Sequence, residues 1–157
     1  PKWYLNPPKD KNKFYAVGDA MRPQLNLSKK IATSRARDEL ARQIKTEVRS
    51  KLNDYQKASG LGMDAEASEF NEYVSGNVVN MSLEYSVIEE TDVRDGRVFV
   101  LVSWDAKAAA KAAKESARNS AKRDNAYRSE LEARNAFDRL DDAIDKIEGS
   151  SSVSPRE

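Results

Sequence analysis

The chain contains no cysteine and no histidine among its 157 residues. Without thiols it can form no disulfide, and it offers no thiolate to a metal ion or to a covalent intermediate. Without imidazole it lacks a frequent general base, a frequent metal ligand and every histidine-dependent triad. Only carboxylates, lysines, serines and tyrosines are left for catalysis, and no pair of them is placed suggestively. We therefore expect a protein that is not an enzyme and that uses no metal or cofactor.

Long apolar runs are also absent. No stretch of the chain approaches the roughly 20 residues needed to span a bilayer, and no signal peptide is present. The 27 basic and 26 acidic residues leave a net charge of +1, so the composition provides no overall attraction to nucleic acid or acidic membrane. The chain begins at Pro1 rather than at methionine, and we expect that a targeting segment has been removed upstream.

The most regular stretch runs from Leu27 to Lys57. Its apolar residues recur at steps of three to five, with charged residues between them: Ile31, Ala36, Leu40, Ile44, Val48, Leu52 and Tyr55. This spacing predicts one long amphipathic helix, with Ser28 as its N-cap and an end before Gly60. Acids alternate with the arginines of its outer face, which favours a salt-bridged surface over a phosphate site. After Gly60, Ala65–Val74 is predicted to form a short helix.

Three stretches are predicted to form a small antiparallel sheet. Phe14–Gly18 is a short apolar run, and Val78–Glu90 alternates apolar and polar residues like a half-buried strand. Val98–Trp104 is apolar on both faces, so we expect it in the centre of the sheet. The Asp95-Gly96 pair before it predicts a type I′ hairpin turn. The expected fold class is α+β, with a strand, a helix and a hairpin packed around the long helix.

The N-terminal stretch Pro1–Asn12 is rich in proline and lysine. Pro7 and Pro8 oppose a helix, so we expect an extended arm. Trp3 and Tyr4 lie near its start. The favoured interpretation is that they attach the arm to the core, and the alternative is that they contact a partner or a glycan.

Two helices are predicted after the sheet. Ala106 to about Ala126 is rich in alanine and lysine and has no breaker, so its apolar side permits close approach to a neighbour. Tyr127–Glu148 resembles a coiled-coil seam of about two heptads. Its candidate partner-binding residues are Leu131, Phe137, Leu140, Ile144 and Ile147. The expected organisation is an α+β domain over 1–113, a helical extension over 114–148 and a disordered tail over 149–157.

A basic stripe between Lys107 and Arg123 is the strongest candidate for phosphate contacts. Its members are Lys107, Lys111, Lys114, Arg118, Lys122 and Arg123. A nucleic-acid-binding α/β module that uses this stripe is the alternative to a protein-interaction domain. No exposed aromatic residue is expected near the stripe, which argues against stacking on single strands.

Several residues, taken in order, resemble a known family. They are Pro1-x-Trp3-Tyr4, Tyr15-Ala16-Val17-Gly18, Ser28, Ala32, Ala36-Arg37-x-Glu39-Leu40-Ala41, Ile44, Val48, Val98-x-Val100-Leu101-Val102 and Asp105. This set resembles the LPP-twenty family of bacterial envelope lipoproteins, similar to the N-terminal domain of flagellar assembly protein T, over Pro1–Ala113. The resemblance implies a strand, a long helix and a hairpin, a lipidated cysteine upstream of Pro1, and no catalysis. It provides no binding residues.

These observations predict a non-enzymatic lipoprotein domain of the bacterial envelope, in the periplasm or at the outer membrane. It would act as a structural or protein-interaction module. A sheet has two faces and only one main helix is expected to cover it, so the second face needs the C-terminal helix, the Phe70–Val74 segment or another copy of the chain. We expect a protein partner or a homo-oligomer at these surfaces. Contact with a membrane is expected only through the lipid anchor, and contact with nucleic acid is not expected.

Overall fold

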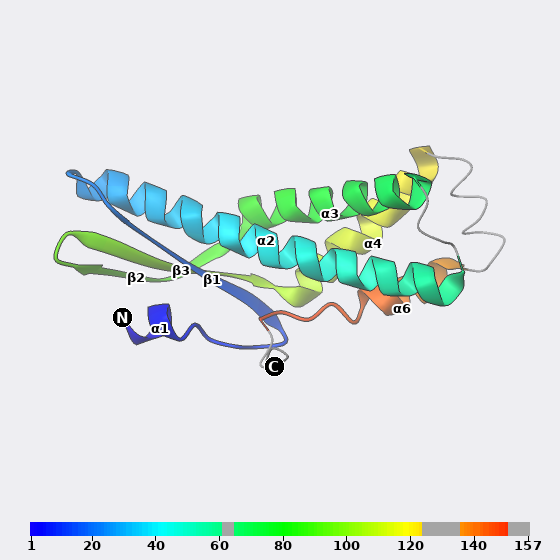
Figure 1. Cartoon of the computed structure of the whole chain (residues 1–157), viewed down its shortest axis with the longest axis horizontal. Coiled ribbons are helices and arrows are strands. Elements are labelled where there is room, and N and C mark those ends of the chain that lie inside the picture. The colour runs from blue at the N-terminus through cyan, green and yellow to red at the C-terminus, as the bar shows by residue number, and fades with distance from the viewer. Residues whose placement is uncertain (61–64, 124–135, 151–157) are drawn as a thin grey trace. The chain divides into compact units, whose positions relative to one another are not determined.

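The computed structural model describes residues 1–60, 65–123 and 136–150 (Figure 1). Its elements are α1 (Lys2–Leu5), β1 (Lys13–Met21), α2 (Leu25–Ser59), α3 (Ala65–Tyr85), β2 (Val87–Arg94), β3 (Arg97–Asp105), α4 (Ala106–Arg123) and α6 (Ala136–Ile144). The fold class is α+β, as predicted. The arm is not extended throughout, because α1 forms one helical turn before the two prolines.

The chain forms two compact units from interleaved segments. The first comprises 1–43, 81–106 and the residues from 148 onwards, and the second comprises 44–80 and 107–147. This division differs from the linear one expected from the sequence, with boundaries after 113 and 148. The reason is that α2 and α3 each contribute one part to the first unit and another part to the second.

The first unit contains the sheet, whose strand order is β1-β3-β2 with both pairs antiparallel (Figure 1). β3 lies in the centre, as its apolar character on both faces predicted. At the hairpin, φ is 51° at Asp95 and 82° at Gly96. Two positive φ values are what a type I′ turn requires. The prediction of the hairpin turn is therefore confirmed.

The prediction of a strand over Val78–Glu90 is wrong for most of its length, because α3 continues to Tyr85 and β2 begins at Val87. The residues buried along this helix are spaced by four: Val74, Val78 and Ser82. Residues four apart lie on one face of a strand and also on one face of a helix. The same residues are therefore compatible with either element. Alternate apolar residues that suggested the strand are instead exposed: Met81, Leu83 and Tyr85.

Helix α2 matches its predicted range closely, but its start differs. Ser28 is not the N-cap, because its N–H already donates to the Gln24 carbonyl at 3.1 Å. The Ser28 hydroxyl instead accepts a hydrogen bond from the Arg22 N–H at 2.7 Å. Ile31, expected in the core, is half-buried, and Ala32 is buried in its place. The fully buried residues follow a spacing of four: Ser28, Ala32, Ala36, Leu40, Ile44, Val48, Leu52 and Gln56.

One face of the sheet packs against α2. Alternate residues of β1 are buried there, and Gly18 makes the closest approach. A Cβ added to Gly18 would lie 2.5 Å from the Ala36 nitrogen and nearer still to the Ala32 carbonyl oxygen. On the other face, the Tyr4 ring of α1 meets the Phe99 ring edge-on, with centroids 4.9 Å apart. Part of the second face is therefore covered by the N-terminal arm, as the favoured interpretation of Tyr4 proposed.

The second unit packs helices together through small and amide side chains. Asn71 exchanges two hydrogen bonds with Gln56, at 2.8 and 2.9 Å. Asn77 donates to the Ser116 hydroxyl at 2.8 Å. The apolar side of α4 is buried and consists of alanines: Ala109, Ala110, Ala112, Ala113 and Ala117. The buried alanines match the small apolar side expected of this stretch.

Replacing Gly18 with alanine should lower the free energy of unfolding by about 1–3 kcal/mol. The new methyl group would clash with helix backbone, which cannot move aside as the end of a flexible side chain can. Gly76, inside α3, is the matched control, since nothing lies within 4 Å of its added Cβ. Gly76→Ala should raise the free energy of unfolding by about 0.5–1 kcal/mol. Urea unfolding followed by far-UV circular dichroism measures both. A Gly18→Ala variant as stable as the parent would contradict the close contact.

Candidate functional site

The outer edge of β1 is partly covered by the segment that follows α6. Gly149 N–H donates to the Lys11 carbonyl at 2.8 Å, and Ser150 N–H donates to the Lys13 carbonyl at 2.7 Å. The Ser150 hydroxyl also accepts the Tyr15 N–H at 2.6 Å. Residues 149 and 150 are therefore ordered against β1 and do not belong to a disordered tail. The rest of the expected tail, 151–157, lies outside the described residues.

One residue of this edge keeps its backbone groups free. In an antiparallel strand successive residues point their N–H and C=O alternately to the two sides, so Tyr15, Val17 and Asp19 all face outward. The Tyr15 N–H donates to the Ser150 hydroxyl. The Asp19 carbonyl accepts a hydrogen bond from Arg35 Nη1 at 2.8 Å. Within the described residues, the outward N–H and C=O of Val17 have no hydrogen-bond partner.

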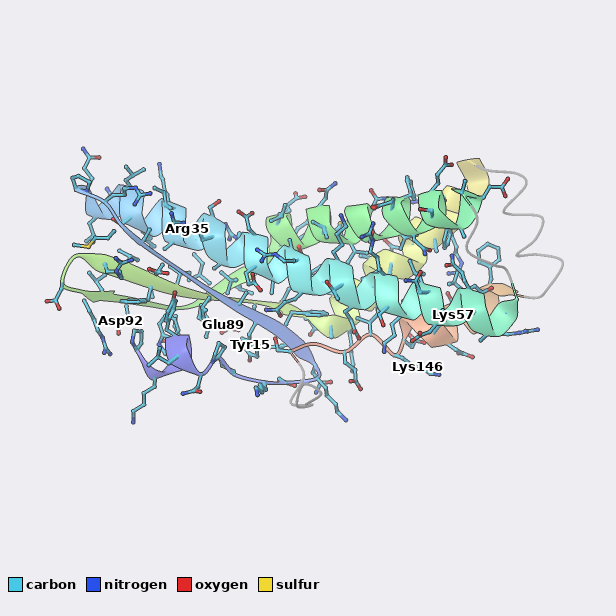
Figure 2. All side chains as sticks on the ribbon, viewed as in Figure 1. Tyr15, Arg35, Lys57, Glu89, Asp92 and Lys146 are labelled. Atoms are coloured by element: carbon cyan, nitrogen blue, oxygen red, sulfur yellow. The ribbon has the colours of Figure 1, made fainter. Side chains whose placement is uncertain are left out.

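A groove of about 640 Å³ lies over this free position. Its floor is the edge of β1 from Tyr15 to Asp19, and Ser150 lies at one end. One wall consists of side chains of α2: Arg35, Glu39 and Gln43. The opposite wall is the N-terminal arm: Tyr4, Pro7, Pro8 and Lys9. Figure 2 labels Tyr15 on β1 and Arg35 on α2, which belong to the floor and to the helical wall.

The arm is attached to the sheet through Asp19. Its carboxylate accepts a hydrogen bond from the Tyr4 hydroxyl at 2.5 Å and another from Arg97 Nη1 at 2.5 Å. The hydrogen bond from Tyr4, followed by that from Arg97, holds the pKa of Asp19 below its ordinary value. The same contact raises the pKa of Tyr4. At neutral pH the site therefore holds an ionised carboxylate and a neutral phenol, which fix the arm over the sheet.

A second carboxylate is bound on the same face of the sheet. Glu89 Oε2 accepts the Ser103 hydroxyl at 2.5 Å and lies 3.3 Å from Lys13 Nζ. The Ser103 hydrogen bond, and after it the Lys13 contacts, lower the pKa of Glu89, while Glu89 raises the pKa of Lys13. Figure 2 shows Glu89 on β2. Because each of these shifts moves away from neutrality, neither pair is tuned for proton transfer near pH 7.

The residues predicted to bind a partner lie in different places. Trp3 is half-buried in α1, and Tyr4 lines the groove. The C-terminal seam is instead buried in the second unit: Leu140, Ile144 and Ile147. The Arg118 guanidinium carbon lies over the Phe137 ring, 5.5 Å from the centroid of that ring. Leu131 lies outside the described residues. Of the predicted residues that the structure describes, only Tyr4 lines the groove.

The basic stripe on α4 is partly neutralised within the second unit. Arg118 donates two hydrogen bonds to the Asp141 carboxylate, at 3.0 and 2.7 Å, and Lys114 pairs with Asp145. Lys111 is exposed. The side chains of Lys122 and Arg123 lie outside the described residues. These ion pairs engage two of the six basic residues within the second unit, and the nucleic-acid alternative stays a prediction.

No protein-family model matches the chain, and no curated protein matches it. Among the residues that the structure describes, no group of three or more acidic side chains is arranged to hold a metal ion. None of the helices in these ranges is both long enough and apolar enough to cross a membrane.

Replacing Asp19 with asparagine should lower the free energy of unfolding at neutral pH by about 1 kcal/mol, because two hydrogen bonds to a partly exposed charge are weakened. The folded-state pKa of Asp19 lies below its ordinary 3.8, so its ionised form stabilises the fold above that value. This contribution is lost as the pH falls through the folded-state pKa. The difference between parent and variant should therefore shrink below a pH of about 4.

Urea unfolding at neutral and at acid pH measures the Asp19 effect. Asp38→Asn is the matched control, since Asp38 is an exposed acid on α2. A pH-independent difference for Asp19→Asn, or an equal one for Asp38→Asn, would show that the carboxylate does not hold the arm.

Replacing Leu140 with alanine should lower the free energy of unfolding of the isolated chain by about 2–5 kcal/mol, because it empties a fully buried position. Lys146→Ala, an exposed change shortly after α6, should stay within about 0.5 kcal/mol of the parent. Thermal and urea unfolding compare the two. If Leu140→Ala left stability unchanged and abolished self-association, the seam would be a partner surface after all.

Proposed function

We propose that this chain is a non-enzymatic protein-interaction domain of a bacterial envelope lipoprotein. The observation that carries the proposal is the groove beside β1, whose floor presents the free N–H and C=O of Val17. Open strand edges flanked by side-chain walls are a recurring means of binding other polypeptides. A protein ordinarily covers or blunts such an edge, and β1 is covered on both sides of Val17 but not at Val17 itself.

The electrostatics of the site favour binding over chemistry. Both carboxylates of the sheet face already accept hydrogen bonds from cationic and hydroxyl partners. Their pKa values lie below the ordinary range, whereas a general acid or base works best with a pKa near the working pH. The charged groups thus hold the arm and the strands in place and shape the groove.

The envelope part of the proposal depends on the likeness to the LPP-twenty family. The order of strand, long helix and hairpin that this likeness implies is compatible with β1, α2 and the β2–β3 pair. The inserted helix α3 departs from it. Because a fold supports many functions, this is an argument by analogy. A lipidated cysteine upstream of Pro1 and residence at the periplasmic side or outer membrane are parts of the same proposal.

Two measurements in bacterial cells test this function, using the gene from its natural start. Metabolic labelling with an alkyne fatty acid, followed by membrane fractionation, should place a lipidated product in the envelope. A photo-cross-linking amino acid at three surface positions should yield at least one adduct with another envelope protein. The positions are Val17 in the groove, Val93 on β2 and Lys111 on α4. An unlabelled protein in the soluble fraction with no adduct at any of these positions would overturn the proposal.

A further inference from the structure

We propose that the groove beside β1 binds an extended acidic peptide segment of a protein partner, which pairs with Val17 as an added strand. This inference rests on the proposed function and names the occupant of the same site. The chain already shows this mode of binding on the neighbouring part of the edge. Gly149 and Ser150 lie along Lys11–Tyr15 through main-chain hydrogen bonds of 2.7 to 2.8 Å.

The backbone of β1 sets where the peptide pairs. Ser150 occupies the edge at Tyr15, and Arg35 occupies it at the Asp19 carbonyl. Val17 lies between these two positions with a free donor and a free acceptor on the same side. An extended peptide satisfies both groups at once, because a strand presents its own N–H and C=O on one side at every second residue. A compact ligand without this repeat would satisfy only one of them.

The walls of the groove select a single strand over a second folded copy. Side chains of α2 flank the edge on one side, and Tyr4, Pro7 and Pro8 flank it on the other. The sheet edge of another copy would bring its own covering helix against these walls. By contrast, the residues of β2 are exposed along nearly the whole strand. The prolines offer no N–H, and with Tyr4 they provide an apolar surface for peptide side chains.

The charges of the groove select acidic side chains. Its two acids already have cationic partners: Asp19 binds Arg97, and Glu39 lies 2.9 Å from Arg42. Lys9 and Arg35 are exposed, and no carboxylate of the described residues lies within ion-pair distance of either. The charge of Arg35 also acts on Asp19. With Arg97 and Arg42 included, four cations lie around two acids, so the charge about the groove is positive and acidic residues of a peptide complement it.

The test uses nuclear magnetic resonance on the purified chain. The probe is a pool of acetylated heptapeptides that alternate Glu or Asp with Val, Ile or Thr, and the control pool carries Lys in place of the acids. In the free chain, the Val17 amide should exchange with solvent faster than the amides of Ala16 and Gly18, which pair with β3. The acidic pool should slow exchange at Val17 and shift the resonances of the groove, whereas the basic pool should not.

Val17→Pro removes the one donor that the peptide needs. Proline is tolerated on an edge strand where the N–H points outward, so the sheet should persist. The matched control is Val93→Pro, which removes an outward N–H from the other edge, since the closing pair of the hairpin is Arg94 with Arg97. Val17→Pro should weaken binding about tenfold, and Val93→Pro should leave it unchanged. Lys9→Gln combined with Arg35→Gln should weaken it about fivefold at low salt.

The outcomes separate this inference from the proposed function. Equal binding of the acidic and basic pools, no shift at the groove, or undiminished binding by Val17→Pro would overturn the inference. Slowed exchange at Val17 that depends on the concentration of the chain alone would show a second copy as the occupant, which would also overturn it. If cross-links in cells then formed at Val93 or Lys111, the proposed function would stand without a groove ligand.

Discussion

The close packing of β1 against α2 is the constraint on which the first unit depends. Gly18 allows it, because the helix backbone at Ala32 and Ala36 occupies the space that any Cβ would need. This approach brings the side chains of α2 alongside the outer edge of β1, where they form one wall of the groove. A larger residue would push the strand from the helix, so the packing of the core and the shape of the site have the same cause.

Hydrogen bonds to charged groups hold parts of the structure in addition to this packing. Asp19 sits on the outer face of β1, and its bonds to Tyr4 and Arg97 attach the N-terminal arm, which supplies the second wall of the groove. The Tyr4–Phe99 ring contact attaches the same arm to the sheet. Asp19 therefore organises the site without being available for chemistry. In the second unit, Arg118 and Asp141 play a comparable part by pairing α4 with α6.

Helix α2 serves both units because its buried residues follow a spacing of four over most of its length. A turn of helix takes 3.6 residues, so this stripe winds slowly around the axis. Small residues at Ala32 and Ala36 meet the strand, whereas the larger buried residues from Ile44 onward belong to the second unit. The size of the buried side chains of α2 thus differs between the part of the helix in the first unit and the part in the second.

The sequence by itself determined the elements that local rules specify. The Asp95-Gly96 turn depends on backbone conformations that few residues adopt, and the apolar pattern of β3 favours a central strand. Tertiary structure decided the rest. Val78 to Tyr85 suits a helix or a strand, and only burial of Val74, Val78 and Ser82 distinguishes them. The groove joins the arm, β1 and α2 to Ser150, which lies far from them in sequence. Its key feature is the backbone of Val17, which is unpaired within the described part of the chain. Every residue except proline carries the same main-chain donor and acceptor, so which of these groups stay unpaired is set by the fold.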